Sequence, residues 1–117
     1  MAPNETWLSD WKIGLSPETE AQASRELLEL FRRFWQWAEL THNSRSTQQR
    51  YSGALHALGG WTLEQVVQSA DQSSIESQLR KATSAGDGPL IYQDQPEWQR
   101  ELDVTCRKLH KFLCLQQ

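Results

Sequence analysis

The chain has 117 residues, of which 38% are hydrophobic, and a formal net charge of -3 from 12 basic and 15 acidic side chains. This length predicts one domain that can bury a core without disulfide or metal support. The acidic balance argues against strong nonspecific binding to nucleic acid, and no apolar run approaches the roughly 20 residues that span a bilayer. The first residues lack the basic start and apolar stretch of a secretory signal, so we expect a cytoplasmic protein.

Residues 1–15 are expected to form an N-terminal arm in front of a single helical domain over residues 16–117. Trp7 and Trp11 lie four residues apart, which places both indoles on one side of a short helical turn. Two interpretations are open. The arm could dock on the core through these tryptophans, or it could present them as an exposed aromatic anchor that binds a partner protein.

The main helix is expected to begin at Ser16-Pro17 and to run to about Thr41. Serine at the N-cap and proline at the first helical position are a good start signal. The stretch Leu27–Leu40 is rich in aromatic residues, and its apolar arc covers about half of the helix surface. We therefore expect this helix to lie between neighbours on both sides, at the centre of an all-α bundle.

Four shorter helices are expected after it. A capping box at Ser46–Gln49 opens the second helix, and Gly59-Gly60 ends it. A second capping box at Thr62 opens a helix over residues 62–70, and another follows over 75–86. The last helix begins near Asp94 and Pro96, after a loop rich in glycine and proline. Its buried stripe is expected to hold Trp98, Leu102, Thr105, Leu109, Phe112 and Leu113.

The fold class that follows is all-α: a compact bundle of four to five helices with an N-terminal arm and no sheet. One core is expected to contain Phe31, Phe34, Tyr51, Leu55, Leu102 and Leu109.

The cysteines and histidines do not predict a metal site, a cofactor or an enzyme. Cys106 and Cys114 are eight residues apart on the last helix, or about 12 Å along its axis, which is too far for a disulfide. His110 lies midway between them, but three ligands spread over two helical turns cannot all reach one zinc ion. The sequence has no phosphate-binding glycine loop and no known catalytic motif.

Two segments are poor in acidic residues. Residues 43–60 carry two arginines and no acid, and residues 98–117 carry four basic and two acidic groups. The outward faces of these two segments could contact phosphates or base edges, although a solvated polar surface is the alternative. The candidate residues for binding double-stranded DNA are Arg45, Thr47, Gln49, Arg50, Arg100, Arg107 and Lys111. We expect the two faces to form one surface.

The run FRRFWQWAELTHNSRSTQQRYSGAL, in which Ser44, Thr47 and Tyr51 have the spacing Ser-x-x-Thr-x-x-x-Tyr after an aromatic helix, resembles the start of a known domain. This is the core-binding, SAM-like domain of tyrosine recombinases (phage integrases). The whole chain also resembles small uncharacterised bacterial proteins that carry such a helical pattern alone. The resemblance implies a bundle that clamps one face of a duplex, with Thr47 and Arg50 turned toward the DNA.

Recombinases carry a separate catalytic domain, with an arginine, a His-x-x-Arg motif and a tyrosine nucleophile, for which this chain has no room. The sequence therefore predicts a non-catalytic DNA-binding or DNA-associated accessory module of a bacterial or mobile-element system. The alternative is a protein-interaction module that uses Trp7 and Trp11 or the acidic surface of residues 61–97. A small-ligand site among the tryptophans is a third, weaker possibility.

Overall fold

The computed structural model describes residues 2–14, 17–68 and 74–115. All regular structure in these ranges is helical, which confirms the all-α class. The elements are α1 (Thr6–Asp10), α2 (Pro17–Trp37), the 3-10 turn η1 (Leu40–His42), α3 (Arg45–Gln68), α4 (Ile75–Thr83) and α5 (Pro96–Leu115).

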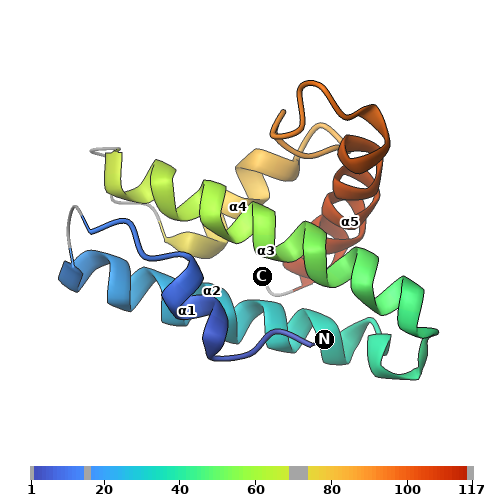
Figure 1. Ribbon diagram of the computed structural model, residues 1–117, viewed down its shortest axis with the longest axis horizontal. Coiled ribbons are helices and arrows are strands. Elements are labelled where there is room, and N and C mark those ends of the chain that lie inside the picture. The colour runs from blue at the N-terminus through green and yellow to red at the C-terminus, as the bar shows by residue number, and fades with distance from the viewer. Residues whose placement is uncertain (1, 15–16, 69–73, 116–117) are drawn as a thin grey trace.

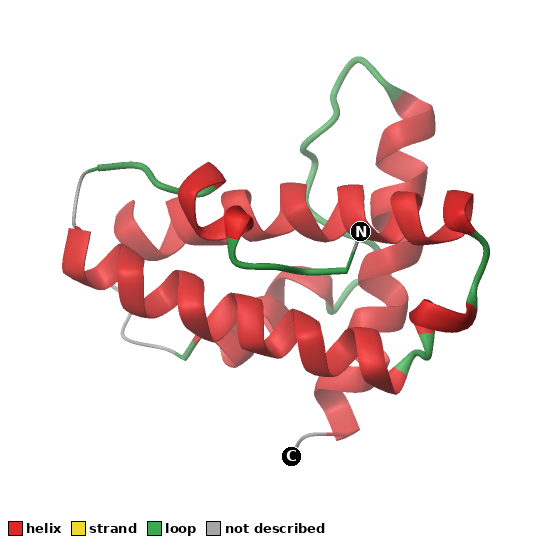
Figure 2. Ribbon diagram, turned by 60° about the horizontal axis from the view of Figure 1, so that its bottom comes forward, coloured by secondary structure: helices red, strands yellow, loops and turns green. Residues whose placement is uncertain are grey.

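Helices α2 and α3 lie side by side and form the middle of the molecule (Figure 1). The N-terminal segment with α1 lies over one side of this pair, and α4 and α5 cover the other side, as the turned view shows (Figure 2). Helix α2 therefore has neighbours on two sides, as its wide apolar arc predicted.

The buried core joins α2, α3 and α5. Five of the six residues expected to meet there have no exposed surface, and Tyr51, the sixth, is partly buried against them. Phe34 contacts Phe112 of α5 edge to face, with ring centroids 5.9 Å apart. The predicted core is confirmed.

Helix α2 ends earlier than predicted. Glu39 has a left-handed backbone with φ of 54°, which stops the helix at Trp37. The next residue, Leu40, is fully buried in η1, so the chain turns there because an apolar side chain is anchored in the core. Ser16, the expected cap, lies outside the described residues.

Helix α3 runs without a break through Gly59-Gly60, so the predicted stop and the predicted new helix at Thr62 are wrong. The glycines make room for a neighbour instead. A Cβ atom on Gly59 would lie 2.2 Å from Cζ2 of Trp11. Thr62 is buried within the helix, and its hydroxyl donates to the Leu58 carbonyl at 2.8 Å.

The start of α3 and the end of α4 differ from the predicted positions. Ser44, rather than Ser46, caps α3, because its Oγ accepts the backbone N–H of Thr47 at 3.3 Å. Ser74 caps α4 in the same way, by accepting the backbone N–H of Ser77 at 3.2 Å. Helix α4 ends at Thr83, three residues before the predicted end.

The N-terminal tryptophans are docked on the core. Trp7 is 6% exposed and Trp11 3% exposed, and Nε1 of Trp11 donates to the carbonyl of His56 at 2.9 Å. The docked-arm interpretation is confirmed. The alternative of an exposed anchor is corrected, since a partner could reach these indoles only after the arm had left the core.

Candidate functional site

A groove lies between α3 and α5, the two helices that make the most extensive contact in the described structure. Its volume is about 530 Å³. Helix α3 contributes Thr47, Arg50 and Tyr51, and helix α5 contributes Glu97, Arg100, Glu101, Val104 and Thr105. We call this hollow the α3–α5 groove.

The helical period explains why these side chains line the groove. Leu102 and Leu109 of α5 point into the core with no exposed surface. Val104 lies outside this buried stripe and is 47% exposed. The groove thus follows the line along which the buried stripe of α5 meets its polar surface.

A second, smaller hollow of about 230 Å³ adjoins the groove, and Arg50 and Glu101 line both. Their ion pair, with Nε and Oε1 3.6 Å apart, separates the two hollows. Both side chains are well exposed, so the pair contributes about 1 kcal/mol or less to stability. The other lining residues are Gln49, Gly53, Ala54, Tyr92 and Trp98.

The charges in the α3–α5 groove are mixed. Glu97 and Glu101 line it together with Arg50 and Arg100. The ammonium of Lys108 lies 5.6 Å from the centre of the Tyr51 ring, in a cation–π contact. The guanidinium of Arg100 makes no ion pair with a described carboxylate, so it is available to a ligand.

The structure brings only part of the predicted DNA-binding set together. Thr47, Arg50 and Arg100 line the groove, and Gln49 lines the adjoining hollow. Arg107 lines neither the groove nor the adjoining hollow.

Nε of Arg107 donates to the Gly86 carbonyl at 2.9 Å, which ties this side chain to the connection between α4 and α5. Arg45 and Lys111 are exposed but line neither hollow. The Arg107 side chain is therefore held beside the backbone of a different segment, and its place on one surface with Arg45, Gln49, Arg100 and Lys111 stays a prediction.

The sequence interpretation missed the aromatic part of this region. Trp98 was expected in the buried stripe of the last helix, but it is 54% exposed. It lies in the first turn of α5 and packs edge to face on Tyr92, with ring centroids 5.5 Å apart. Partial burial, and after it the nearby Glu101 carboxylate, raise the pKa of Tyr92. The contact between Tyr92 and Trp98 could have been predicted from the loop of residues 86–95, because this loop carries apolar residues just before the start of the last helix.

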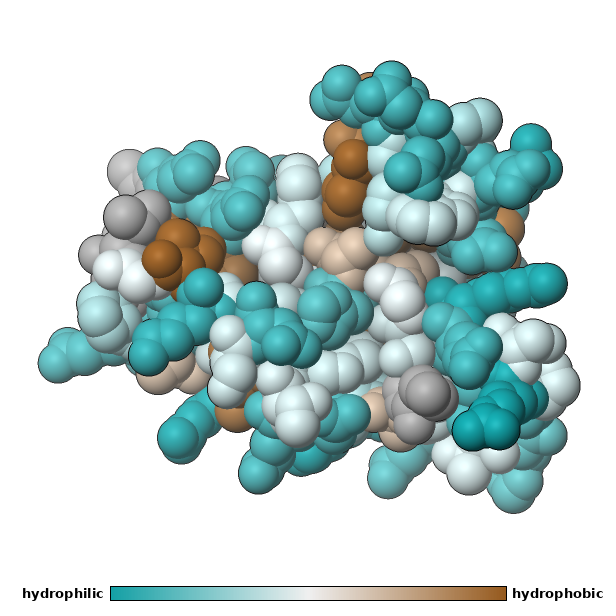
Figure 3. All heavy atoms as spheres, in the orientation of Figure 1, coloured by the Kyte–Doolittle hydropathy of each residue, from teal (hydrophilic) through white to brown (hydrophobic). Residues whose placement is uncertain are grey.

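Hydrophobic atoms reach the surface near the connection between α4 and α5, whereas most of the visible face is polar (Figure 3). Leu90 in this connection is 67% exposed. The amide of Gln99 holds the connection in place, because its Oε1 accepts the backbone N–H groups of Ile91 and Tyr92. The shape of the smaller hollow therefore depends on Gln99.

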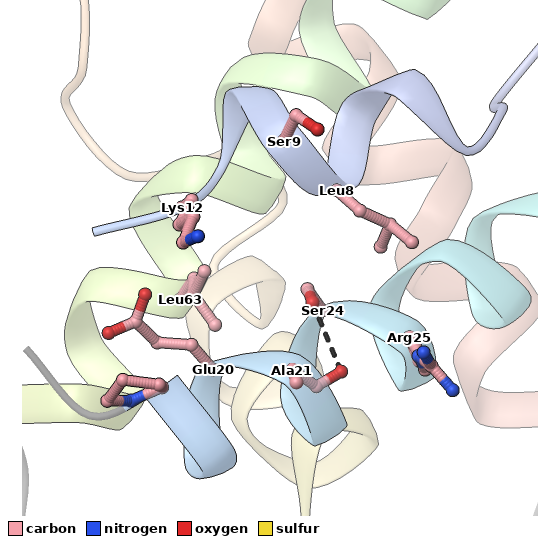
Figure 4. Close-up of a pocket in the computed structure, with 9 residues that line it drawn as sticks. Leu8, Ser9, Lys12, Glu20, Ala21, Ser24, Arg25 and Leu63 are labelled. Carbon is pink, nitrogen blue, oxygen red and sulfur yellow. Dashed lines mark hydrogen bonds between the residues drawn. The ribbon is translucent and has the colours of Figure 1, made fainter. Parts of the chain in front are cut away.

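A further hollow of about 300 Å³ lies between α1, α2 and α3 (Figure 4). Glu20 lies at its edge and is 4% exposed. Its Oε1 accepts the backbone N–H groups of Ile13 and Gly14 at 2.7 and 2.9 Å. The carboxylate thus fastens the arm to α2, which explains why an acidic residue is buried there.

No three acidic, histidine or cysteine side chains among the described residues are arranged to hold a metal ion. Over the same residues, no helix combines the length and the apolar character needed to cross a bilayer.

No family model, no curated protein and no solved structure matches this chain. The resemblance to recombinase core-binding domains therefore stays a prediction.

Proposed function

We propose that this chain is a non-catalytic protein-interaction module, and that the α3–α5 groove receives an amphipathic segment of a partner protein. One observation carries the proposal: the groove combines an exposed apolar side chain, Val104, with the guanidinium of Arg100, which makes no ion pair with a described carboxylate. A partner segment would place an apolar side chain against Val104 and Tyr51, and a carboxylate on Arg100.

The residue types around the groove support a protein partner. Tryptophan, tyrosine and arginine are enriched among the residues that carry most of the energy of protein interfaces. Trp98 and Tyr92 line the adjoining hollow, and Arg50 lines both. A segment seated in the groove could therefore extend over the Arg50–Glu101 pair and contact the exposed ring of Trp98.

The acidic residues also favour protein over nucleic acid. Glu97 and Glu101 line the groove beside the two arginines, and they would repel a phosphate backbone at short range. A peptide carries one or two carboxylates at chosen positions, so it can pair with Arg100 and avoid the glutamates.

Selection from a phage display library of helical peptides would test the proposal. We expect the enriched peptides to carry an acidic residue next to an apolar one. Val104→Asp and Arg100→Glu should each weaken their binding about tenfold or more, equivalent to about 1.4 kcal/mol. Fluorescence anisotropy with labelled peptide gives the dissociation constants.

Arg25→Glu provides the matched control, because it makes the same charge change on α2, where it lines the hollows beside α1 and α4 instead of the groove. It should leave peptide binding unchanged. If Val104→Asp and Arg100→Glu both bind the enriched peptides as the unaltered chain does, the groove is not the binding site.

Double-stranded DNA is the second candidate ligand. This candidate goes with the proposal that the fold is SAM-like and resembles the core-binding domain of integrases. The observation in its favour is that Thr47, Arg50 and Arg100, drawn from two helices, line one groove. Each cation that neutralises a phosphate contributes about -0.9 to the slope of log affinity against log salt concentration. With so few cations, binding should be weak and should fade by physiological salt.

For this candidate we expect the double variant Arg50→Ala/Arg100→Ala to reduce that salt slope by about 2. Arg107→Ala should change it less, because the Arg107 side chain is engaged with the Gly86 carbonyl. Titration of a labelled duplex over a range of salt concentrations measures both slopes. Absence of duplex binding at low salt, where the electrostatic attraction is strongest, would remove DNA as a ligand.

A further inference from the structure

Three side chains outside the groove form a hydrogen-bonded series between α4 and the end of α5. Oγ1 of Thr83 lies 2.9 Å from Nδ1 of His110. Nε2 of the same ring lies 3.5 Å from Sγ of Cys114. Thr83 is buried, His110 is half-buried and Cys114 is exposed. The series therefore leads from the interior to a thiol at the surface.

The bonds of Thr83 fix which nitrogen of His110 carries the proton. Its hydroxyl lies 2.8 Å from the Leu79 carbonyl, which can only accept, so the single hydroxyl hydrogen is used there. The Thr83 oxygen must then accept from Nδ1–H. In the neutral ring this leaves Nε2 as an acceptor, and it faces the thiol of Cys114.

A nucleophile within reach of a base that a third group orients is the arrangement that activates serine and cysteine side chains. Cys106, on the same helix, has the opposite environment. It has no exposed surface, and burial, together with the nearby carboxylates of Asp103 and Asp87, raises its pKa to about 12. The two thiols of this chain should therefore differ widely in reactivity.

We propose that Cys114 is a site of thiol–disulfide exchange with low-molecular-weight disulfides of the glutathione class, and that His110 is its base. The Cys114 proton passes to Nε2 of His110, and Sγ attacks one sulfur of the disulfide R–S–S–R. A bond forms between Sγ and that sulfur while the R–S–S–R bond breaks. The leaving thiolate takes the proton from His110, so the products are a mixed disulfide on Cys114 and one free thiol RSH.

Oxidised glutathione and the folded full-length chain test this proposal, with intact mass and peptide mapping as readouts. We expect one glutathione adduct per chain, on Cys114, and no adduct on Cys106. His110→Asn, which keeps a polar group near Thr83 but removes Nε2, should slow adduct formation about tenfold. His42→Asn makes the same change at an exposed turn outside the series and should leave the rate unchanged.

Thr83 is a positioning residue in this proposal. Thr83→Val keeps the shape and removes the hydroxyl, so the rate should fall, whereas Thr83→Ser should restore it. Circular dichroism checks that each variant is folded. Modification of Cys106 as fast as Cys114 in the folded chain, or an unchanged Cys114 rate in folded His110→Asn, would overturn the proposal.

Discussion

Replacing Phe34 with alanine is expected to lower the free energy of unfolding by about 3–5 kcal/mol. The ring has no exposed surface and joins three helices. It comes from α2, meets Phe112 of α5 edge to face, and lies 6.5 Å from the Tyr51 ring of α3 between centroids. A cavity at this junction cannot be filled by the movement of one neighbour, because each neighbour belongs to a different helix.

Urea denaturation followed by far-ultraviolet circular dichroism measures this loss. Trp37→Ala is a useful control, because Trp37 also packs against Phe34 and Phe112 but is 40% exposed. It should cost less, about 1–2 kcal/mol. A loss of about 1 kcal/mol or less for Phe34→Ala would contradict the central position of α2. Since Tyr51 also lines the α3–α5 groove, Phe34→Ala should also lower the affinity for any ligand that binds there.

The all-α class and the core could be predicted because both depend on local periodicity. The stripe of Leu27, Phe31 and Phe34 recurs with the helical period, and such a stripe can be buried in only one direction. Leu55, Leu102 and Leu109 follow the same rule on the other two long helices. No information from distant residues was needed for these assignments.

The break at Gly59-Gly60 was predicted wrongly because a contact between distant residues decides it. Taken locally, two glycines after an apolar stripe indicate a helix end. In the structure the indole of Trp11, 48 positions earlier, occupies the space that a side chain at 59 would need. The same glycines thus permit a close approach, which periodicity within α3 cannot reveal.

The candidate site was only partly predictable for a related reason. The sequence indicated which faces of the second and last helices are polar, but not how the two helices cross. The crossing places Arg50 beside Glu101 and leaves Arg100 in the groove. It also exposes Trp98, whose helical phase alone placed it in the core. Tertiary packing, which sets the crossing, therefore also sets the chemistry of the groove.

The contact between Trp11 and Gly59 leads to the second large expected effect. Trp11→Ala should lower the free energy of unfolding by about 3–5 kcal/mol, because the indole is 3% exposed and its Nε1–H donates to the His56 carbonyl. Gly59→Ala should cost about 1–3 kcal/mol through overpacking, although alanine is the better helix former by about 1 kcal/mol. Urea denaturation of each variant gives these values.

Two other glycines of α3 serve as matched controls. A Cβ atom on Gly53 would meet no heavy atom within 4 Å, and one on Gly60 would make an ordinary contact of 3.6 Å with Cδ1 of Trp11. Gly53→Ala and Gly60→Ala should therefore be neutral or stabilise the helix by up to about 1 kcal/mol. If Gly59→Ala is as stable as these two, Trp11 does not approach α3 as closely as the structure indicates.

The double variant separates the close contact from any other effect at position 59. Once Trp11→Ala has removed the indole, the added Cβ atom at 59 no longer meets it. The effect of Gly59→Ala on the free energy of unfolding should then reverse its sign. The substitution should stabilise the chain by about 1 kcal/mol, through helix propensity alone. The two substitutions would thus show a coupling energy of about 2–4 kcal/mol in a double-mutant cycle. The same cost for Gly59→Ala with and without Trp11 would mean that the constraint comes from the backbone of α3 itself.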